Sequence, residues 1–295
     1  MGRVIGYAHI TNLYRPEGQT VLLFRECYAL EKVHGTSSSV SWRDGGVHLH
    51  TGHRSAENFR RAICGGDDSL APLHGLFVAL GHEKVIVYGE AYGGSEQKQS
   101  HRYGPELRFV AFDVQIGGIW LTVPNAHDVC TKLCLEFVHY ERVSTDLPVL
   151  DAQRDAPSMQ ATRNGVEGDK PREGVVLRPL VEVTLSNGER ICAKHKRAEE
   201  RETATERPVV DPSKLEVLAN AEAIAMEWVT TTRLQHVLDK LPAATDISKT
   251  RDVIAAMVAD VVREGAGEFV DSKEARGAIG KRTVELFKAH LKDAS

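Results

Sequence analysis

The pattern of apolar residues changes its period once along the 295-residue chain, and this change most constrains what the chain can fold into. Up to about Pro208, apolar and polar residues alternate in short runs separated by glycine-containing turns, which is typical of β-strands. From about Asp211 onward the chain is rich in alanine and its apolar residues recur with the period of an amphipathic helix. We therefore predict two domains, 1–207 and 208–295.

The first domain shows the signals of an α+β fold. Three β-hairpins with glycine in their turns are predicted, namely 38–42 with 47–51, 108–116 with 119–123, and 181–185 with 190–196. The predicted helices are 56–63, 70–80 and 125–137. Asn125 is the candidate N-cap of the third helix. The polar segment 151–172 has no period and is predicted to be a mobile loop or an insertion. Together these elements predict antiparallel sheets with peripheral helices.

The second domain is predicted to be small and all-α. Helical stretches are expected over 212–239, with a break near the middle, over 252–263, and from a cap at Asp271 or Ser272 to Leu291. An OB fold is disfavoured because no five-strand alternation is present. The last helix is locally basic, which leaves two roles open. The domain either contacts a nucleic-acid backbone or only packs on the first domain.

Composition limits the setting and the partners. With 37 basic and 41 acidic residues the formal net charge is -4, so any contact with a nucleic acid must use a local basic patch. The five cysteines are an odd number, and the N-terminus lacks the layout of a signal peptide. No run of about 18 apolar residues occurs. We therefore expect a cytoplasmic, reduced monomer that does not span a membrane.

Five short blocks of reactive residues follow one another between residues 28 and 197. They are Lys32-Val33-His34-Gly35, Gly89-Glu90 with glycines after it, Phe112-Asp113, Glu173-Gly174-Val175-Val176 and Lys194-His195-Lys196. Each block alone also fits a charged strand end, a core aromatic or a protected edge strand. In the last block, the strand period of two places both lysines on one face.

In order and spacing, the five blocks resemble the motifs of covalent nucleotidyltransferases, the superfamily of ATP-dependent RNA and DNA ligases and mRNA capping enzymes. Within this superfamily, two segments are most similar to the RNA ligase 2 branch, which includes phage nick-sealing and trypanosome editing ligases. They are Glu31-Lys32-Val33-His34-Gly35-Thr36-Ser37 and His53-Arg54-Ser55. The resemblance implies an ATP-dependent RNA ligase for RNA repair that seals 3′-OH and 5′-phosphate ends. Its expected substrate is a nick in duplex RNA or in an RNA-containing hybrid, and its expected intermediates are a lysyl-AMP and an RNA-adenylate.

The resemblance also implies roles for single residues. Lys32 is the expected nucleophile, and Lys194 and Lys196 are expected to stabilise charge on the phosphate. Glu173 is the expected carboxylate near Mg²⁺ or Mn²⁺. The further nucleotide contacts expected are Glu31 at the adenine edge, His34, Gly35, Arg54 on a phosphate, Glu90 on the ribose and Phe112 stacked on adenine.

The chemistry explains why these residue types are needed. Attack on phosphorus requires a neutral amine, whereas an unperturbed lysine is protonated at physiological pH. Neighbouring cations and a partly desolvated pocket disfavour the ammonium form. We therefore expect Lys194, Lys196 and the metal ion to activate Lys32 as well as to bind phosphate.

Several alternatives stay open at this stage. His34 either packs under the turn or orients the pyrophosphate or the substrate. Asp113 either supports the site from behind or pairs structurally with Arg or Lys. Glu31 is alternatively an exposed residue, and Arg178 is expected to be a solvated side chain. For the whole chain, the alternatives are a DNA ligase, a GTP-using capping enzyme, or a catalytically silent module that binds a nucleotide or RNA.

Overall fold

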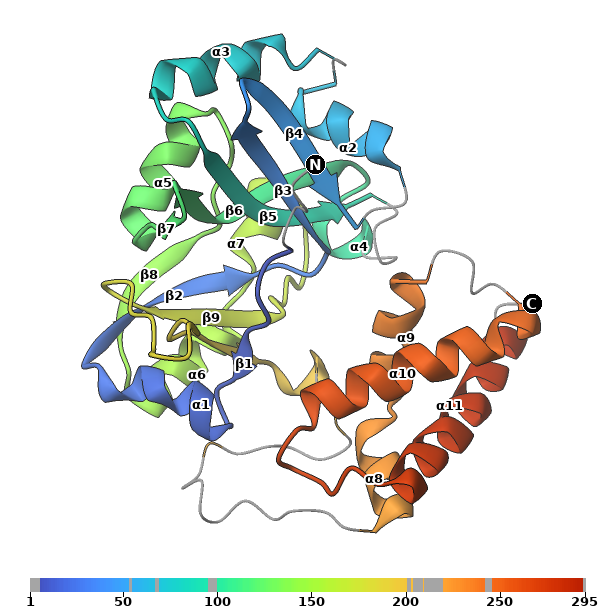
Figure 1. Ribbon diagram of the computed structural model, residues 1–295. Helices are drawn as coiled ribbons and strands as arrows, with labels where there is room; N and C mark the ends of the chain where they lie inside the picture. The colour runs from blue at the N-terminus through green and yellow to red at the C-terminus, as the bar shows by residue number, and fades with distance from the viewer. Residues whose placement is uncertain are drawn as a thin grey trace. The chain divides into compact units, whose positions relative to one another are not determined.

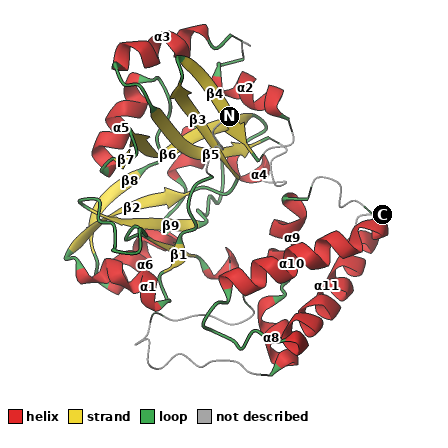
Figure 2. Cartoon of the chain, viewed as in Figure 1, coloured by secondary structure: helices red, strands yellow, loops and turns green. Residues whose placement is uncertain are grey.

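The computed structural model describes residues 6–52, 55–66, 69–94, 100–200, 203, 209, 220–241 and 246–293. The chain forms two compact units, Met1–Arg197 and Ala198–Ser295. In the described part, the sheets lie in the first unit and the second unit is built from helices (Figure 2). The predicted boundary between residues 207 and 208 lies outside the described residues.

The first sheet of unit one has the strand order β1-β10-β9-β2-β8 (Figure 1). Its strands are β1 (Thr11–Asn12), β10 (Ala193–Lys196), β9 (Gly174–Pro179), β2 (Glu26–Lys32) and β8 (Tyr140–Ser144). β1 pairs with β10 in parallel, and the remaining pairs are antiparallel. This order places β2 beside β9, and so next but one to β10, although β2 lies far from both in the sequence.

The second sheet is antiparallel throughout, in the order β4-β3-β5-β6-β7. Its strands are β4 (Gly46–Thr51), β3 (Thr36–Arg43), β5 (Val85–Gly93), β6 (Leu107–Ile116) and β7 (Ile119–Trp120). Val85, Val87 and Ala91 of β5 recur at period two and are fully buried. They belong to a core that also contains Phe59 and Phe77 from two covering helices.

The helices of unit one are short and cover the sheets. They are α1 (Pro16–Gln19), α2 (Ala56–Ile63), α3 (Ala71–Leu80), α4 (Ser100–Tyr103), α5 (Val123–Lys132), α6 (Leu147–Asp155) and α7 (Met159–Arg163), with a 3-10 turn over Thr20–Leu23. Helices α2 and α5 pack on β6 of the second sheet, whereas α6 packs on β8, β9 and β10 of the first.

The predicted α+β class is confirmed, and so are the first two hairpins and the helices near 56–63 and 70–80. The third hairpin is confirmed only next to its turn, where Thr184 forms an antiparallel bridge to Arg190 and Leu185 donates its N–H to the Glu189 carbonyl oxygen at 2.7 Å. The strand predicted over 181–185 is wrong. The strand β10 pairs instead with the apolar strand β9, which offers a buried partner face.

Two other local predictions are also wrong. The third helix begins at Val123 and ends at Lys132, and Asn125 lies inside it rather than at its cap. Pro124 explains the earlier start. The backbone N–H groups of the first helical turn have no partner within the helix, so proline, which lacks an N–H, is well tolerated there. The segment 151–172 contains the end of α6 and all of α7, and Ser158 and Gln160 are fully buried. Polar contacts hold this segment in place, so the search for an apolar period missed it.

Unit two contains α8 (Ala221–Trp228), α9 (Thr231–Asp239), α10 (Thr250–Glu264) and α11 (Lys273–Asp293), with a short 3-10 turn at Ile247–Lys249. The fully buried Trp228, Ile279 and Phe287 centre its core. The predicted break in 212–239 lies between α8 and α9, where the Thr230 hydroxyl accepts a hydrogen bond from the Arg233 N–H at 3.2 Å. The all-α prediction is confirmed.

Two simpler expectations concern cysteines and membranes. All five cysteines are free thiols, with Cys130 buried and Cys134 exposed. Across the described residues, no helix combines the length and the apolar character needed to cross a membrane.

Candidate active site

Three neighbouring strands of the first sheet bring reactive side chains to one place. Lys32 ends β2, Lys196 ends β10, and both pair in register with Gly174, the first residue of β9 between them. Gly174 has a φ of +153°, and a Cβ there would lie 2.2 Å from the His195 carbonyl oxygen. Only glycine permits so close an approach of the two strands. As a result Glu173, directly before Gly174, lies between the two lysines.

The carboxylate of Glu173 is the centre of the site. One oxygen lies 2.9 Å from Lys32 Nζ and the other lies 3.1 Å from Lys196 Nζ. His34 Nδ1 lies 3.5 Å from the first oxygen. The side chain of Glu173 is 2% exposed, against 25% for Lys32 and 12% for Lys196. Burial alone would raise the pKa of Glu173, but the two ammonium groups and the His34 ring hold this pKa well below its ordinary value.

Glu90 reaches the same site from the second sheet. A Cβ on Gly35 would lie 2.3 Å from the Ala91 carbonyl oxygen and 2.8 Å from Glu90 Cγ, so the turn after Lys32 lies directly on β5. The pKa of Glu90 is raised to about 8, mainly by burial. The positive charge of Lys32 lowers this pKa in part, and the negative charge of Glu173 raises it. Burial thus disfavours the ionised form of Glu90 beside the two lysines and the Glu173 carboxylate.

The two neighbours of Lys32 in the sequence are both buried. Glu31 is 2% exposed, so the alternative of an exposed residue is wrong. Its carboxylate accepts hydrogen bonds from the backbone N–H groups of Met159 at 2.9 Å and Gln160 at 3.2 Å, whereas the predicted contact with adenine stays a prediction. His34 is buried and its ring contacts Glu173, whereas the alternative that it orients the pyrophosphate or the substrate stays a prediction.

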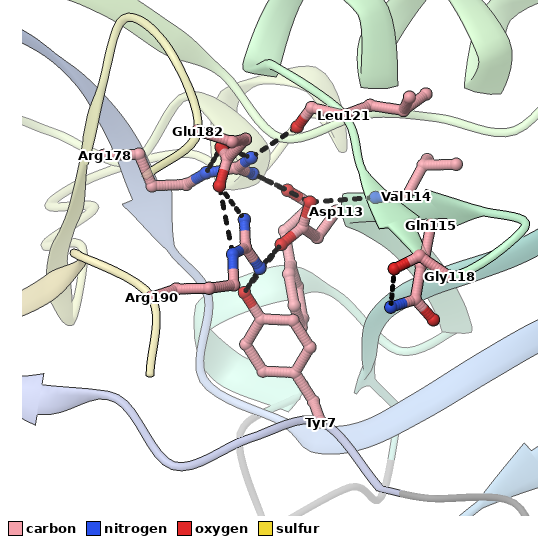
Figure 3. A network of polar contacts seen from close by, with 10 residues as sticks. Tyr7, Asp113, Val114, Gln115, Gly118, Leu121, Arg178, Glu182 and Arg190 are labelled. Atoms are coloured by element: carbon pink, nitrogen blue, oxygen red, sulfur yellow. Dashed lines mark hydrogen bonds and ion pairs between the residues drawn. The ribbon is translucent and has the colours of Figure 1, made fainter. Parts of the chain in front are cut away.

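Asp113 lies in a separate buried network of charged groups (Figure 3). Its oxygens lie 3.0 Å from Arg178 Nη1 and 2.6 Å from Arg190 Nη1, and Tyr7 donates its hydroxyl to Asp113 at 2.7 Å. Burial and the Asp113 charge raise the pKa of Tyr7, which keeps this hydroxyl a donor. Glu182 pairs with both arginines. Asp113 therefore pairs structurally with arginine, and the prediction of a solvated Arg178 is wrong, since this side chain is 2% exposed.

The remaining predicted residues are placed less fully. The ring of Phe112 packs edge-on against Tyr7, with centroids 4.9 Å apart. Lys194 lies two residues before Lys196 in β10, opposite Val176 of β9. Arg54 lies outside the described residues.

Sequence reasoning missed the residues that support this site from behind. Tyr103 accepts a hydrogen bond from the His34 N–H at 3.1 Å, and Arg190 stacks over Trp120 at 4.0 Å from the ring centroid. Tyr103, Tyr7 and Arg190 lie in segments without a motif. The hydrogen bonds Tyr103–His34, Tyr7–Asp113 and Arg190–Tyr7 join residues that are 69 to 183 positions apart in the sequence, so no local signal identifies them.

A model of the RNA ligase family matches residues 25–196, which is more than half of the chain. The chain belongs to the RNA ligase family. The matched range contains the three-strand cluster of this family member, from Lys32 through Glu173 to Lys196. No curated protein matches its sequence.

Solved RNA ligase structures share the fold of this family member. The structure of Naegleria gruberi RNA ligase with PPi has a TM-score of 0.50 and 16% sequence identity, and the match covers 66% of this chain and 57% of that chain. A glutamate-to-alanine mutant of the Naegleria gruberi RNA ligase with ATP and Mn gives a TM-score of 0.51, 14% identity and coverages of 68% and 58%. The chain thus spans less than two thirds of those ligases, and at such identity the likeness extends to the fold alone.

Proposed function

We propose that the chain is an ATP-dependent RNA ligase that works through a covalent lysyl-AMP on Lys32. The observation that carries this proposal is the cluster in which the buried Glu173 carboxylate lies 2.9 Å from the Lys32 amine and 3.1 Å from the Lys196 ammonium. The family match and the solved neighbours with ATP and Mn support the same chemistry. In this cluster a nucleophile lies beside a fixed cation that can stabilise phosphate charge.

The first step is the reaction with ATP. The Lys32 nitrogen attacks the α-phosphorus, the nitrogen–phosphorus bond forms, the bond to the bridging oxygen breaks, and pyrophosphate leaves. The amine must lose its proton for this attack, and because its side chain is 25% exposed it can pass the proton to water. The role proposed for Lys196, which also holds Glu173, is to stabilise the negative charge on the α-phosphate.

Glu173 fits a role in holding a divalent cation, Mg²⁺ or Mn²⁺. Mg²⁺ is commonly bound by one or two carboxylates together with substrate phosphates and waters, so a single buried carboxylate suffices. In the described residues no group of three or more His, Cys, Asp or Glu side chains forms a complete metal cage. Such a cation would supply positive charge to the phosphates, and Glu173 shared with it would hold the Lys32 proton less tightly.

The following two steps join the RNA ends. A 5′-phosphate oxygen attacks the lysyl-AMP phosphorus, the nitrogen–phosphorus bond breaks, and Lys32 regains its proton. A 3′-OH then attacks the 5′-phosphate, loses its proton, and AMP leaves. A nick in duplex RNA or in an RNA-containing hybrid holds both ends in line, which favours it as the substrate. Arg54, Phe112 and Lys194 are proposed contacts of the nucleotide and the 5′-phosphate.

The helical second unit is proposed to engage the RNA backbone. Its last helix, α11, is basic in its final turn, where His290 and Lys292 lie. A chain that ends at Arg207 should still react with ATP, whereas sealing should fall much further, since backbone contacts dominate affinity for a polyanion. Equal sealing by the shortened and the full chain would give this unit a packing role only.

Intact-mass measurement after incubation with ATP or with GTP tests the main proposal. The protein should gain the mass of one AMP from ATP and nothing from GTP. Added pyrophosphate should remove the adduct, because pyrophosphate can attack the lysyl-AMP phosphorus in the reverse of the first step and so form ATP again. A GMP adduct would indicate a capping-type enzyme, and no adduct with either nucleotide would indicate a silent binding module.

A further inference from the structure

A short polar segment, residues 158–164, touches the buried neighbours of the proposed nucleophile. On one side it holds Glu31, the residue before Lys32. The Ser158 hydroxyl donates to one Glu31 oxygen, and the N–H groups of Met159 and Gln160 donate to the other. The same Ser158 hydroxyl accepts from the Ala161 N–H at 3.0 Å and so begins α7. The Glu31 carboxylate, 2% exposed, is thereby surrounded by three donors from one segment.

On its other side the segment reaches the residue that follows Lys32 by two positions. Asn164 donates to the Tyr103 carbonyl oxygen at 2.9 Å, and the Tyr103 hydroxyl accepts from the His34 N–H at 3.1 Å. Gln160 donates to the Tyr92 hydroxyl at 2.7 Å, and the Tyr92 and Tyr103 rings meet edge-on at 5.3 Å. Gln160, Tyr92 and Tyr103 are each at most 1% exposed.

A third tie joins the start of the segment, and Pro157 directly before it, to the stretch that precedes Glu173. Arg172, 3% exposed, donates from Nη2 to the Pro157 carbonyl oxygen at 2.7 Å and from Nε at 3.1 Å. Ser158 donates its N–H to the Lys170 carbonyl oxygen at 2.6 Å. Glu31, His34 and Arg172, each next to or close to a site residue, are thus tied to one piece of chain.

We propose that residues 158–164, here named the α7 brace, position Lys32 for attack on the nucleotide, with Ser158 and Tyr103 as positioning residues. The proposal rests on the proposed function of Lys32. The brace binds Glu31 directly and His34 through Tyr103, so it acts through the backbone on either side of the nucleophile. Lys32 itself is 25% exposed on a long flexible side chain, and fixing its backbone at both ends limits where the amine can reach.

Two hydroxyl deletions test the brace. Ser158→Ala removes a donor to Glu31, and Tyr103→Phe removes the acceptor of the His34 N–H. Each should lower the rate of lysyl-AMP formation at saturating ATP by about 10- to 100-fold, the scale of a misplaced reacting group, while the KM for ATP changes by less than about 3-fold. Sealing of a nick that is already adenylylated should fall much less, because that step does not use the Lys32 amine as nucleophile. Ser158→Thr, which keeps the hydroxyl, should restore most of the rate.

Matched controls come from the same unit. Ser144 donates its hydroxyl to Asp146 at 2.7 Å and accepts from the Asp146 N–H at 3.2 Å, as Ser158 does between a carboxylate and a backbone N–H. Tyr140 places its hydroxyl 3.4 Å from His127 Nδ1. Ser144→Ala and Tyr140→Phe should leave lysyl-AMP formation unchanged.

Hydrogen exchange supplies a readout that does not depend on activity. The amides of residues 31–35 should exchange faster in Ser158→Ala and Tyr103→Phe than in the wild type and in the two controls. Unchanged exchange, an unchanged rate, or equal loss of both lysyl-AMP formation and sealing would overturn the proposal. A wild-type protein that forms no lysyl-AMP would instead remove the proposed function, and exchange alone would then decide whether the brace holds this turn.

Discussion

Unit one contains two clusters of charged side chains that differ in balance and in exposure. The site cluster (Lys32, Glu173, Lys196) combines two cations with one carboxylate, and both ammonium groups remain partly open to solvent. The Asp113 network (Tyr7, Asp113, Arg178, Glu182, Arg190) combines two arginines with two carboxylates, none of them more than 14% exposed (Figure 3).

The difference separates a structural role from a functional one. In the Asp113 network every charge has an opposite partner, so little electrostatic attraction is left for a ligand. Each group also offsets the desolvation cost of burying its partners. In the site cluster the excess positive charge faces solvent, which suits a polyanionic ligand and contributes little to the core. Substitutions should therefore affect mainly catalysis in the site cluster and mainly stability in the Asp113 network.

The largest effect is expected for Lys32→Ala. It removes the proposed nucleophile, so the AMP adduct should be absent in an intact-mass measurement, while the far-UV circular dichroism stays as in the wild type. Sealing of a pre-adenylylated nick should persist. The exposed Lys132, which pairs with Asp128 in α5, gives the control Lys132→Ala, and an adduct of normal yield on Lys32→Ala would disprove the assignment.

Arg178→Met should break the Asp113 network. The arginine donates to the Leu121 carbonyl oxygen at 2.7 Å and pairs with Asp113 and Glu182, so its removal leaves buried carboxylates short of partners. We expect a loss of about 3 kcal/mol in the free energy of unfolding, measured by urea titration. Arg142→Met, which removes an exposed pair with Glu26, should leave the free energy of unfolding nearly unchanged. Equal losses in the two variants would erase the contrast.

The sequence predicted the parts of this molecule that follow a local pattern. The hairpin of β3 and β4, the helices α2 and α3, and the all-α second unit follow from periodicity and turn residues. The site cluster was found because Lys32, Glu173 and Lys196 belong to recognisable blocks, although only the sheet order shows that they touch.

What the sequence could not show depends on polar contacts between distant segments. Ser158 and Gln160 are buried because they form hydrogen bonds with Glu31 and Tyr92. These partners are distant in the sequence, and from the sequence alone the polar stretch around Ser158 and Gln160 is indistinguishable from a loop. Arg178 was expected in solvent because charge predicts exposure, and its partners from β6 become visible only in the fold. The strand predicted over 181–185 is absent because β10 pairs with β9 and not with residues 181–185.

Glu173→Ala and Lys196→Ala test the site cluster, where substitutions should affect catalysis more than stability. Each should lower lysyl-AMP formation at least about a hundredfold, or ~2.7 kcal/mol, because each removes a charge-stabilising group. The defect of Glu173→Ala alone should depend on the metal concentration. Lys196→Ala should unfold at nearly the wild-type urea concentration, whereas Glu173→Ala should unfold somewhat earlier, since the two lysines hold the Glu173 pKa below its ordinary value in the folded protein. Near-normal rates in both at low Mg²⁺ would place the metal and phosphate site elsewhere.

The smallest effect is expected for the pH dependence of Glu90→Gln. Burial raises the pKa of Glu90 to about 8, above the value of about 4.3 for an unfolded glutamate. Between these values the folded protein binds a proton that the unfolded chain has released, so this group makes the free energy of unfolding fall as pH rises. Glutamine resembles the protonated carboxyl and does not titrate. Relative to Glu90→Gln, the wild type should therefore lose about 1 kcal/mol between pH 5 and pH 9, a small value because the side chain is only partly buried. Urea titrations of both proteins at the two pH values measure this difference. A wild type that gains stability with rising pH relative to Glu90→Gln would mean that Glu90 is ionised in the folded site, which would then carry two negative charges and no excess positive charge.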